Sequence, residues 1–302
     1  MQDKMNTNEH LDTRIMKPPP KVNEFRRIIR VMTNRWVVVI GLVIALAFII
    51  VAIFAPLIAP YDPNKGILYE KLQQPSSAHL LGTDSVGRDT LSRVLYGTRV
   101  SLIIGVVSVT IAGIIGMSLG LIAGFSGGWL NMVIMRITDA WMSIPPLIFA
   151  LVIATVLGPG LRNVIISLGV ALVPGYCRMM CGEVLSLKEN DYILAAYSVG
   201  SGRIRIMLRH ILPNTFPVLL VLLTLNIGFM ILAEAGLSFL GVGIRPPMAA
   251  WGAMVADGYK YLYTNPVLSF APGISVMLLV LAFNLVGDGL RDALDPRLRG
   301  IL

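Results

Sequence analysis

Long stretches without a charged residue dominate the chain. Five of them cover residues 36–61, 100–135, 140–161, 211–233 and 261–287, and a shorter sixth covers 163–177. A helix needs about 20 apolar residues to cross the ~30 Å hydrocarbon core of a bilayer. Helices buried inside soluble proteins rarely need runs of this length. The pattern therefore predicts an all-α membrane protein.

Turn-forming and polar residues divide these runs into six predicted membrane spans. They cover residues 36–56, 100–124, 131–157, 163–182, 214–235 and 268–287. We expect residues 1–35 to form a partly disordered N-terminal tail, residues 36–290 the membrane domain and 291–302 a C-terminal tail. The first run follows 35 mostly polar residues and exceeds the 7–15 residues typical of a signal-peptide core, so we expect it to remain as a span.

Composition and charge agree with this prediction and orient it. Charged residues make up 14% of the chain, against about 25% in soluble domains. With six spans, 17 of the 25 Lys and Arg residues lie on the side that holds both termini, and 8 lie on the other side. The positive-inside rule therefore predicts that both termini are cytoplasmic. It also makes 61–99 an outer loop and 183–212 a cytoplasmic loop. The net charge of +8 is then a membrane-topology signal and predicts no nucleic-acid partner.

Small residues recur every fourth position in the second predicted span. They are Ser108, Ala112, Gly116, Gly120 and Gly124. Lipid tails are as apolar as leucine, so helices in a bilayer associate through close backbone approach at small residues. We expect this face to pack against another helix. Channels and membrane enzymes pack in the same way, so the face predicts a bundle and no particular activity.

The sequence shows no motif for catalysis or for a cofactor. The dipeptide Gly-Lys is absent, so the chain lacks the phosphate-binding loop that ends in Gly-Lys-Ser/Thr. The three histidines are far apart, and no His, Cys or carboxylate spacing suggests a metal site. Cys177 and Cys181 are interpreted as inert thiols on one helix face. We expect no enzyme activity and no bound cofactor.

Charged residues inside membrane spans are costly and often functional. Four qualify here: Arg136, Asp139, Arg178 and Glu234. Arg136 and Asp139 are three residues apart on one helix face, so we expect them to form an ion pair near the inner end of the third span.

The segment from Leu194 to Gly200 predicts a helix that starts near Asp191 and ends at a glycine. Gly200 can take the left-handed conformation that other residues resist. A basic amphipathic stretch follows and leads to Leu212 and Pro213 before the fifth span. The simplest interpretation is a helix-turn-helix loop.

This segment resembles the coupling loop of ABC importer permeases, Glu-Ala-Ala–x3–Gly–x9–Ile-x-Leu-Pro. The matching residues are Ala195, Ala196, Gly200, Leu212 and Pro213; Leu194 and His210 depart from the pattern. In that family the loop forms a coupling helix that docks on the ATPase subunit.

Three other stretches extend the resemblance to the C-type permease subunit of the dipeptide, oligopeptide and nickel group of ABC importers. They are 81–89 before the second span, 237–241 with Trp251 and Gly252, and 287–296 at the end of the sixth span. The similarity covers roughly residues 25–300, in the order that the topology requires.

The resemblance implies a permease subunit in a bacterial cytoplasmic membrane. Its partners would be a B-type permease, two cytoplasmic ATPase subunits that bind ATP and Mg, and an extracytoplasmic substrate-binding protein. Di- or oligopeptides are the first choice of substrate, and nickel chelates, glutathione or opines are alternatives within the family. A secondary transporter or a channel are the alternatives outside it.

Asp84, Arg88 and Asp89 form a charged cluster just before the second span. One interpretation makes the two aspartates local caps and gives Arg88 an ion pair within the loop. The other places the cluster in the outer vestibule, in contact with the binding protein.

Overall fold

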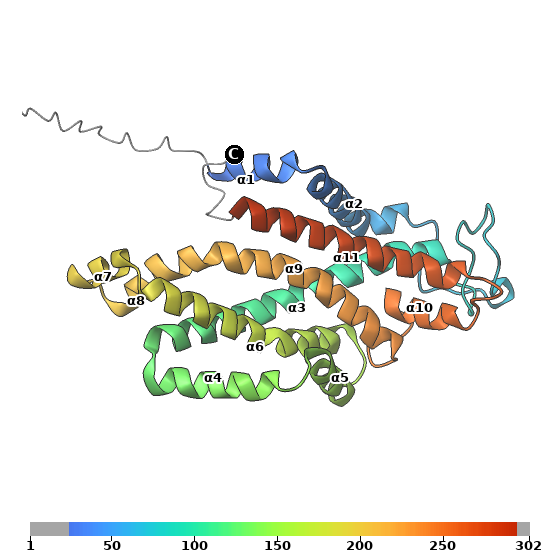
Figure 1. The fold of residues 1–302 in the computed structure, drawn as a ribbon. Coiled ribbons are helices and arrows are strands. Elements are labelled where there is room, and N and C mark those ends of the chain that lie inside the picture. Colours follow the sequence, from blue (N-terminus) through green and yellow to red (C-terminus); the bar gives the residue numbers. More distant parts are fainter. Residues whose placement is uncertain (1–23, 295–302) are drawn as a thin grey trace, which may run out of the picture.

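The computed structural model describes residues 24–294, and this part of the chain contains helices and loops but no β-strand (Figure 1). The all-α prediction is confirmed for these residues. The predicted disordered segment and most of the predicted C-terminal tail fall in 1–23 and 295–302, outside the described residues.

The described residues form the following elements. The α-helices are α1 (Glu24–Asn34), α2 (Trp36–Ile58), α3 (Thr90–Ser126), α4 (Gly128–Met142), α5 (Pro146–Leu157), α6 (Leu161–Lys188), α7 (Asp191–Ser198), α8 (Arg203–Ile206), α9 (Leu212–Phe239), α10 (Trp251–Tyr259) and α11 (Val267–Leu294). A 3₁₀ turn covers Leu68–Glu70 and a π-helical segment covers Met207–Ile211. Five helical stretches are long and apolar enough to cross a membrane, and α4 with α5 makes a sixth if the bent pair counts as one span.

The third predicted span, 131–157, is not one straight helix. It is divided into α4 and α5, which meet at 83°. Pro145 and Pro146 lie at the break, where they lack the N–H groups that a continuous helix needs, and Pro145 also disfavours helical geometry at Ile144. The prediction of a single helix was wrong because it counted apolar residues without the two prolines.

The second span begins earlier than predicted. α3 starts at Thr90, because Asp89 caps it: the carboxylate accepts hydrogen bonds from the Ser92 N–H and hydroxyl, both at 2.7 Å. The non-helical loop on this side is therefore 59–89 rather than 61–99, apart from its 3₁₀ turn.

α3 lies at the centre of the bundle and contacts α2, α4, α6, α9 and α11. Its face of small residues packs on α6. A Cβ at Gly116 would lie 2.6 Å from Tyr176 Cβ, and one at Gly120 would lie 2.7 Å from Met180 Cβ, so neither position has room for a side chain. Ala112 is fully buried, and a Cβ at Gly124 would clash with Val184. The spacing of small residues thus marks the face that meets α6.

α11 and α2 pack along a narrow seam beside this core. A Cβ at Gly41 of α2 would lie 2.6 Å from Leu285 Cβ of α11. Most other α2 side chains point outward, and Leu57 is 81% exposed. An outward apolar surface is what a span needs against lipid.

Trp251, at the start of α10, is fully buried rather than interfacial as expected. Its indole N–H donates to the Val94 carbonyl at 3.0 Å, and its ring fills the space opposite Gly97. Phe48 of α2 meets it edge-on, with ring centroids 5.9 Å apart. One aromatic side chain therefore connects α10, α3 and α2.

The loop 59–89 has a polar core built around Asp84. Its Oδ2 accepts from Arg88 Nε at 2.6 Å, and its Oδ1 accepts from the Arg88 N–H at 2.9 Å. Arg93 of α3 lies 3.7 Å from the same carboxylate and donates to the carbonyls of Pro63 and Pro247. These bonds hold the loop against α3 and the 240–250 segment.

The position of the predicted cluster favours its local structural role. Arg88 is 7% exposed and Asp89 2% exposed, and Asp89 also contacts the ring of His79, with 2.9 Å between Oδ1 and Nδ1. Little of either side chain is left for a partner to contact. A contact between this cluster and a binding protein stays a prediction, and Asp84 is its most accessible member.

The substitution Arg88→Glu should destabilise the protein. It would place a second carboxylate beside Asp84 in a mostly buried site, and losing one partner of a buried ion pair costs about 3–5 kcal/mol. We expect a clearly lower thermal-unfolding midpoint in detergent. Lys65→Glu is the matched control, because it reverses a charge on an exposed residue of the same loop. Equal midpoints for both variants would contradict this role of Arg88.

Candidate functional site

The connection between α6 and α9, residues 189–211, lies at one end of the bundle together with the α3–α4 turn (Figure 1). It holds α7, α8 and the π-helical segment. Ala195, Ala196 and Gly200 fall in α7 and the turn after it, whereas Leu212 and Pro213 open α9. The five predicted coupling residues therefore lie in one region but on two helices.

Gly200 ends α7 in a conformation that depends on glycine. Its φ is +78°. The Ser201 N–H donates to the Ala196 carbonyl at 3.0 Å and the Gly200 N–H to the Tyr197 carbonyl at 2.9 Å, which is the Schellman pattern. A Cβ at position 200 would meet no atom within 4 Å. The backbone, and not crowding, therefore requires glycine here.

The two alanines of α7 face opposite ways. Ala196 is buried in a hydrophobic cluster beneath α7, together with Ile193, whereas Ala195 is exposed. The other buried members come from α3, α6, α8, the π-helical segment and α9: Leu121, Phe125, Met180, Val184, Ile206, Ile211 and Leu219. We call this set the α7 cluster. It attaches α7 to the ends of three long helices.

The outer side of this connection is apolar and basic. Its large exposed apolar side chains are Leu194, Tyr197, Val199 and Ile204, and its exposed basic ones are Arg203, Arg205 and Arg209. Val199 is 81% exposed. Apolar patches of this kind on an otherwise charged surface mark sites where another protein binds.

Lys188 fixes the start of the connection to the end of α3. Its ammonium group donates to the carbonyls of Gly124 and Phe125, at 3.2 and 3.1 Å, and lies 5.8 Å from the Phe125 ring centroid. These are carbonyls at the C-terminal end of α3, where a cation is favourable. The end of α6 and the end of α3 are thereby held together next to α7.

The far end of the connection runs directly into α9. α8, the π-helical segment and α9 form a continuous helix, Arg203–Phe239. The Leu212 N–H bonds to the Met207 carbonyl, one residue further back than in an α-helix. This wider turn precedes Pro213, which has no N–H to offer to a helix. A displacement of α8 therefore reaches α9 without an intervening loop.

The predicted ion pair between Arg136 and Asp139 is not formed. Asp139 pairs instead with Arg178 of α6, and Arg136 has no acidic partner among the described residues. Asp139 faces the neighbouring helix, so a partner across the α4–α6 contact replaces the partner one turn away. The sequence carried no signal for this pairing because it joins residues 39 positions apart.

Glu234 is the one fully buried carboxylate in the predicted spans. Its Oε1 accepts from the Ser238 hydroxyl at 2.7 Å, and that oxygen accepts from the Ile244 N–H at 3.1 Å. The chain of bonds connects α9 to the 240–250 segment. Its position inside the helix contacts indicates a structural role at the end of α9.

The described residues contain no group of three or more His, Cys, Asp or Glu side chains that could hold a metal ion. Cys177 and Cys181 are buried free thiols. Each accepts a polar contact from α4: Thr138 Oγ1 lies 3.5 Å from Cys177 Sγ, and Asn131 Nδ2 lies 3.3 Å from Cys181 Sγ. They help to join α4 and α6.

Comparison with known proteins assigns the fold to a family. Residues 116–300 match the family described as binding-protein-dependent transport system inner membrane component. Residues 24–78 match the N-terminal TM domain of oligopeptide transport permease C. The two matches cover both the first span and the bundle with its α6–α9 connection.

Similar proteins extend over nearly the same length. The dipeptide transport system permease protein DppC of Alkalihalophilus pseudofirmus is 41% identical, over 93% of this chain and 94% of its own. The di/tripeptide transport system permease protein DppC of Pseudomonas aeruginosa is 42% identical, over 86% and 88%. The glutathione transport system permease protein GsiD of Pectobacterium atrosepticum is 42% identical, over 84% and 85%.

The family and its relatives agree with the multi-span bundle, so the chain is a multi-pass protein of the bacterial inner membrane. As an ABC importer permease it works in a transporter complex with other subunits. The chain belongs to the binding-protein-dependent inner membrane components, as a C-type permease subunit of an ABC importer.

Proposed function

We propose that this permease serves an importer of di- and oligopeptides. The observation that carries the proposal is the 41% identity to a dipeptide permease across 93% of the chain. Glutathione, itself a peptide, is the alternative that another relative favours. Nickel chelates and opines have no relative of that name among those compared, and neither a secondary transporter nor a channel has support from the family.

The proposed complex contains three further kinds of subunit. A B-type permease completes the pathway, two cytoplasmic ATPase subunits bind ATP and Mg, and an extracytoplasmic binding protein delivers the peptide. This chain supplies half of the pathway and no cofactor site. ATP hydrolysis is assigned to the partners, because the chain lacks a phosphate-binding loop.

The α6–α9 connection is proposed to receive the movement of an ATPase subunit. The ATPase contacts the outer side of α7, where Leu194, Ala195 and Tyr197 are exposed. The inner side of α7 is fixed in the α7 cluster, so the displacement passes to α3, α6 and α9. Packed helix ends move as a unit because tightly packed contacts transmit strain. The spans then alternate between outward-open and inward-open arrangements.

Gly200→Val tests this transmission. A β-branched residue in the left-handed conformation costs at least about 1–2 kcal/mol, so the turn after α7 should reorganise. We expect normal membrane insertion, with peptide uptake reduced about tenfold or more relative to ATP hydrolysis in reconstituted vesicles. Gly200→Asn is the matched control, because asparagine tolerates this conformation. Equal coupling of uptake to hydrolysis in both variants would remove this turn from the mechanism.

Cysteine labelling tests the proposed orientation with both termini in the cytoplasm. Tyr69→Cys lies in the loop 59–89 and Val199→Cys after α7, and both side chains are more than 80% exposed. In sealed right-side-out vesicles, an impermeant thiol reagent should label position 69 and should label position 199 only after permeabilisation. The native Cys177 and Cys181 are buried, so background labelling should be low. The reverse pattern would contradict the orientation and the docking of ATPases on α7.

A further inference from the structure

The ion pair between Asp139 and Arg178 lies deep in the bundle but remains half exposed. The two side chains are 45% and 49% exposed. Asp139 is eleven residues beyond Gly128, the first residue of α4, which places it about 16 Å along the helix. That depth is close to the middle of a ~30 Å hydrocarbon core.

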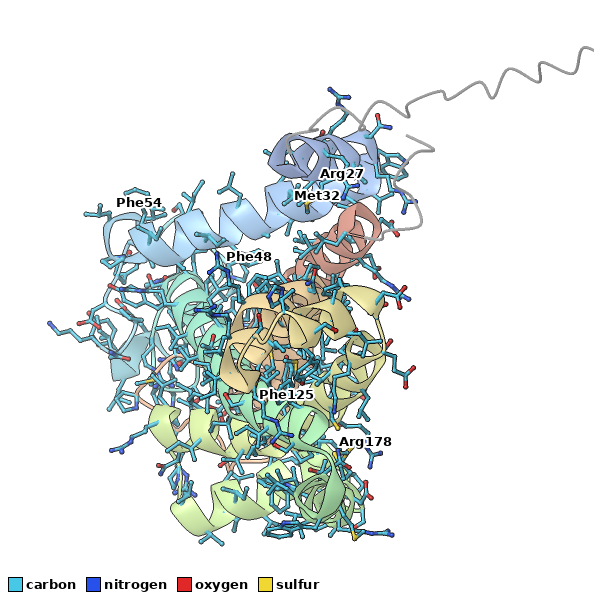
Figure 2. All side chains as sticks on the ribbon, turned by 90° about the vertical axis from the view of Figure 1, so that its left-hand side faces the viewer. Arg27, Met32, Phe48, Phe54, Phe125 and Arg178 are labelled. Atoms are coloured by element: carbon cyan, nitrogen blue, oxygen red, sulfur yellow. The ribbon has the colours of Figure 1, made fainter. Side chains whose placement is uncertain are left out.

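Charged groups at such a depth face protein or a water-filled space rather than lipid. Figure 2 shows Arg178 at the edge of the bundle, on the opposite side from Phe54 of α2. α2 carries a broad outward apolar surface suited to lipid. The side of α4 and α6 that bears the ion pair is therefore the side that faces water or a partner subunit.

The break between α4 and α5 gives a second, independent sign of the same kind. Residues 142–148 are exposed, and Pro145 and Pro146 interrupt the helical hydrogen bonds. Non-helical backbone at membrane depth is tolerated only where protein buries it or where it lines a water-filled cavity. The break begins three residues beyond Asp139, so both features belong to one surface.

A cavity of about 70 Å³ opens directly beside the ion pair. Its lining includes Trp141 and Phe149, with Pro174 and Gly175 of α6. Gly175 lies one helical turn before Arg178, and Trp141 lies two residues after Asp139. The cavity is several times larger than the 10–15 Å³ that one water needs on this measure.

The cavity is apolar except for one donor. The Trp141 indole N–H is buried and has no acceptor among the described residues. A buried donor without a partner is rare in folded proteins and indicates an acceptor from elsewhere. An apolar cavity with a few convergent polar groups is the usual make-up of a ligand site.

We propose that the Asp139–Arg178 pair and this cavity form a peptide-binding site within the translocation pathway. This inference rests on the proposed import of peptides and names residues that would contact them. Arg178 binds the C-terminal carboxylate, Asp139 binds the N-terminal ammonium group, and the cavity takes an apolar side chain. The Trp141 N–H donates to a peptide carbonyl.

The charges of the pair suit a zwitterion. The peptide termini carry one positive and one negative charge, as does the ion pair. When the peptide replaces each partner by its own terminus, no unpaired charge is left in a poorly solvated space, where an unpaired charge is costly. A carboxylate also suits the planar guanidinium group of Arg178.

Neutral substitutions test the charged part of this site in the complete transporter, reconstituted with its ATPases and binding protein. Arg178→Gln and Asp139→Asn should each reduce uptake of a dipeptide about tenfold, because each removes one charged hydrogen-bond partner. ATP hydrolysis stimulated by the loaded binding protein should persist. Arg136→Gln is the matched control, since it removes a charge from the same helix at a residue without an acidic partner. It should change uptake less than twofold.

The double variant Asp139→Asn/Arg178→Gln separates binding from a merely structural ion pair. The proposal expects uptake as low as in the single variants, since both peptide termini have lost their partners. Recovery of uptake in the double variant would overturn it, because a structural pair is harmed only when one charge is left alone. Loss of the B-type permease from the purified complex would also overturn it, in favour of a subunit contact. A wild-type complex without binding-protein-stimulated ATP hydrolysis would instead contradict the proposed function.

Gly175→Leu tests the cavity with both charges in place. A Cβ at this position would meet no atom within 4 Å, so leucine can enter the open space without displacing the backbone. Uptake of a dipeptide with a large apolar side chain should fall at least fivefold relative to uptake of glycylglycine. Equal uptake ratios in wild type and variant would contradict side-chain binding in the cavity.

Discussion

The close approach of α3 and α6 is the contact on which the rest of this structure depends. Burying apolar side chains gives helices in a bilayer little free energy, because lipid tails offer an equivalent environment. Association depends instead on van der Waals contact, and glycines at 116, 120 and 124 let the backbone of α3 reach that of α6. Lys188 then joins the ends of the same two helices through the α3 carbonyls.

Two regions of proposed function follow from the position of α6. Its lower end leads into α7, whose inner face is held by the α7 cluster. Ten residues earlier it carries Arg178, paired with Asp139 at the edge of the proposed peptide site. One helix therefore connects the proposed ATPase contact to the proposed pathway. The continuous helix from α8 into α9 offers a parallel route.

The sequence was sufficient for features that depend on local pattern. Apolar runs locate the spans because hydrophobic length is a property of one segment. The four-residue spacing of small residues marks the α3 face because a helix repeats every 3.6 residues. Gly200 was predictable for the same reason, since a Schellman turn is formed by residues next to one another.

Features that depend on the neighbouring helix were not predictable. The partner of Asp139 is 39 residues away, and a nearer arginine at 136 was the better guess from one helix alone. Ala195 and Ala196 are identical in sequence terms, and only the α7 cluster decides which faces inward. The burial of Arg88 and Trp251 likewise depends on chain segments far from them. The break at Pro145 was visible in the sequence, but a count of apolar residues does not register it.

The central claim is that α7 moves as one body with the ends of α6 and α9. Spin labels at positions 194 and 185 of one chain, and at 194 and 216, measure this directly by double electron–electron resonance, since all three side chains are exposed. The distances should stay unchanged between the nucleotide-free and the vanadate-trapped ATP state of the complete transporter. The distance from position 194 to a label on the B-type permease should change. A shift of α7 against positions 185 and 216 would contradict the account.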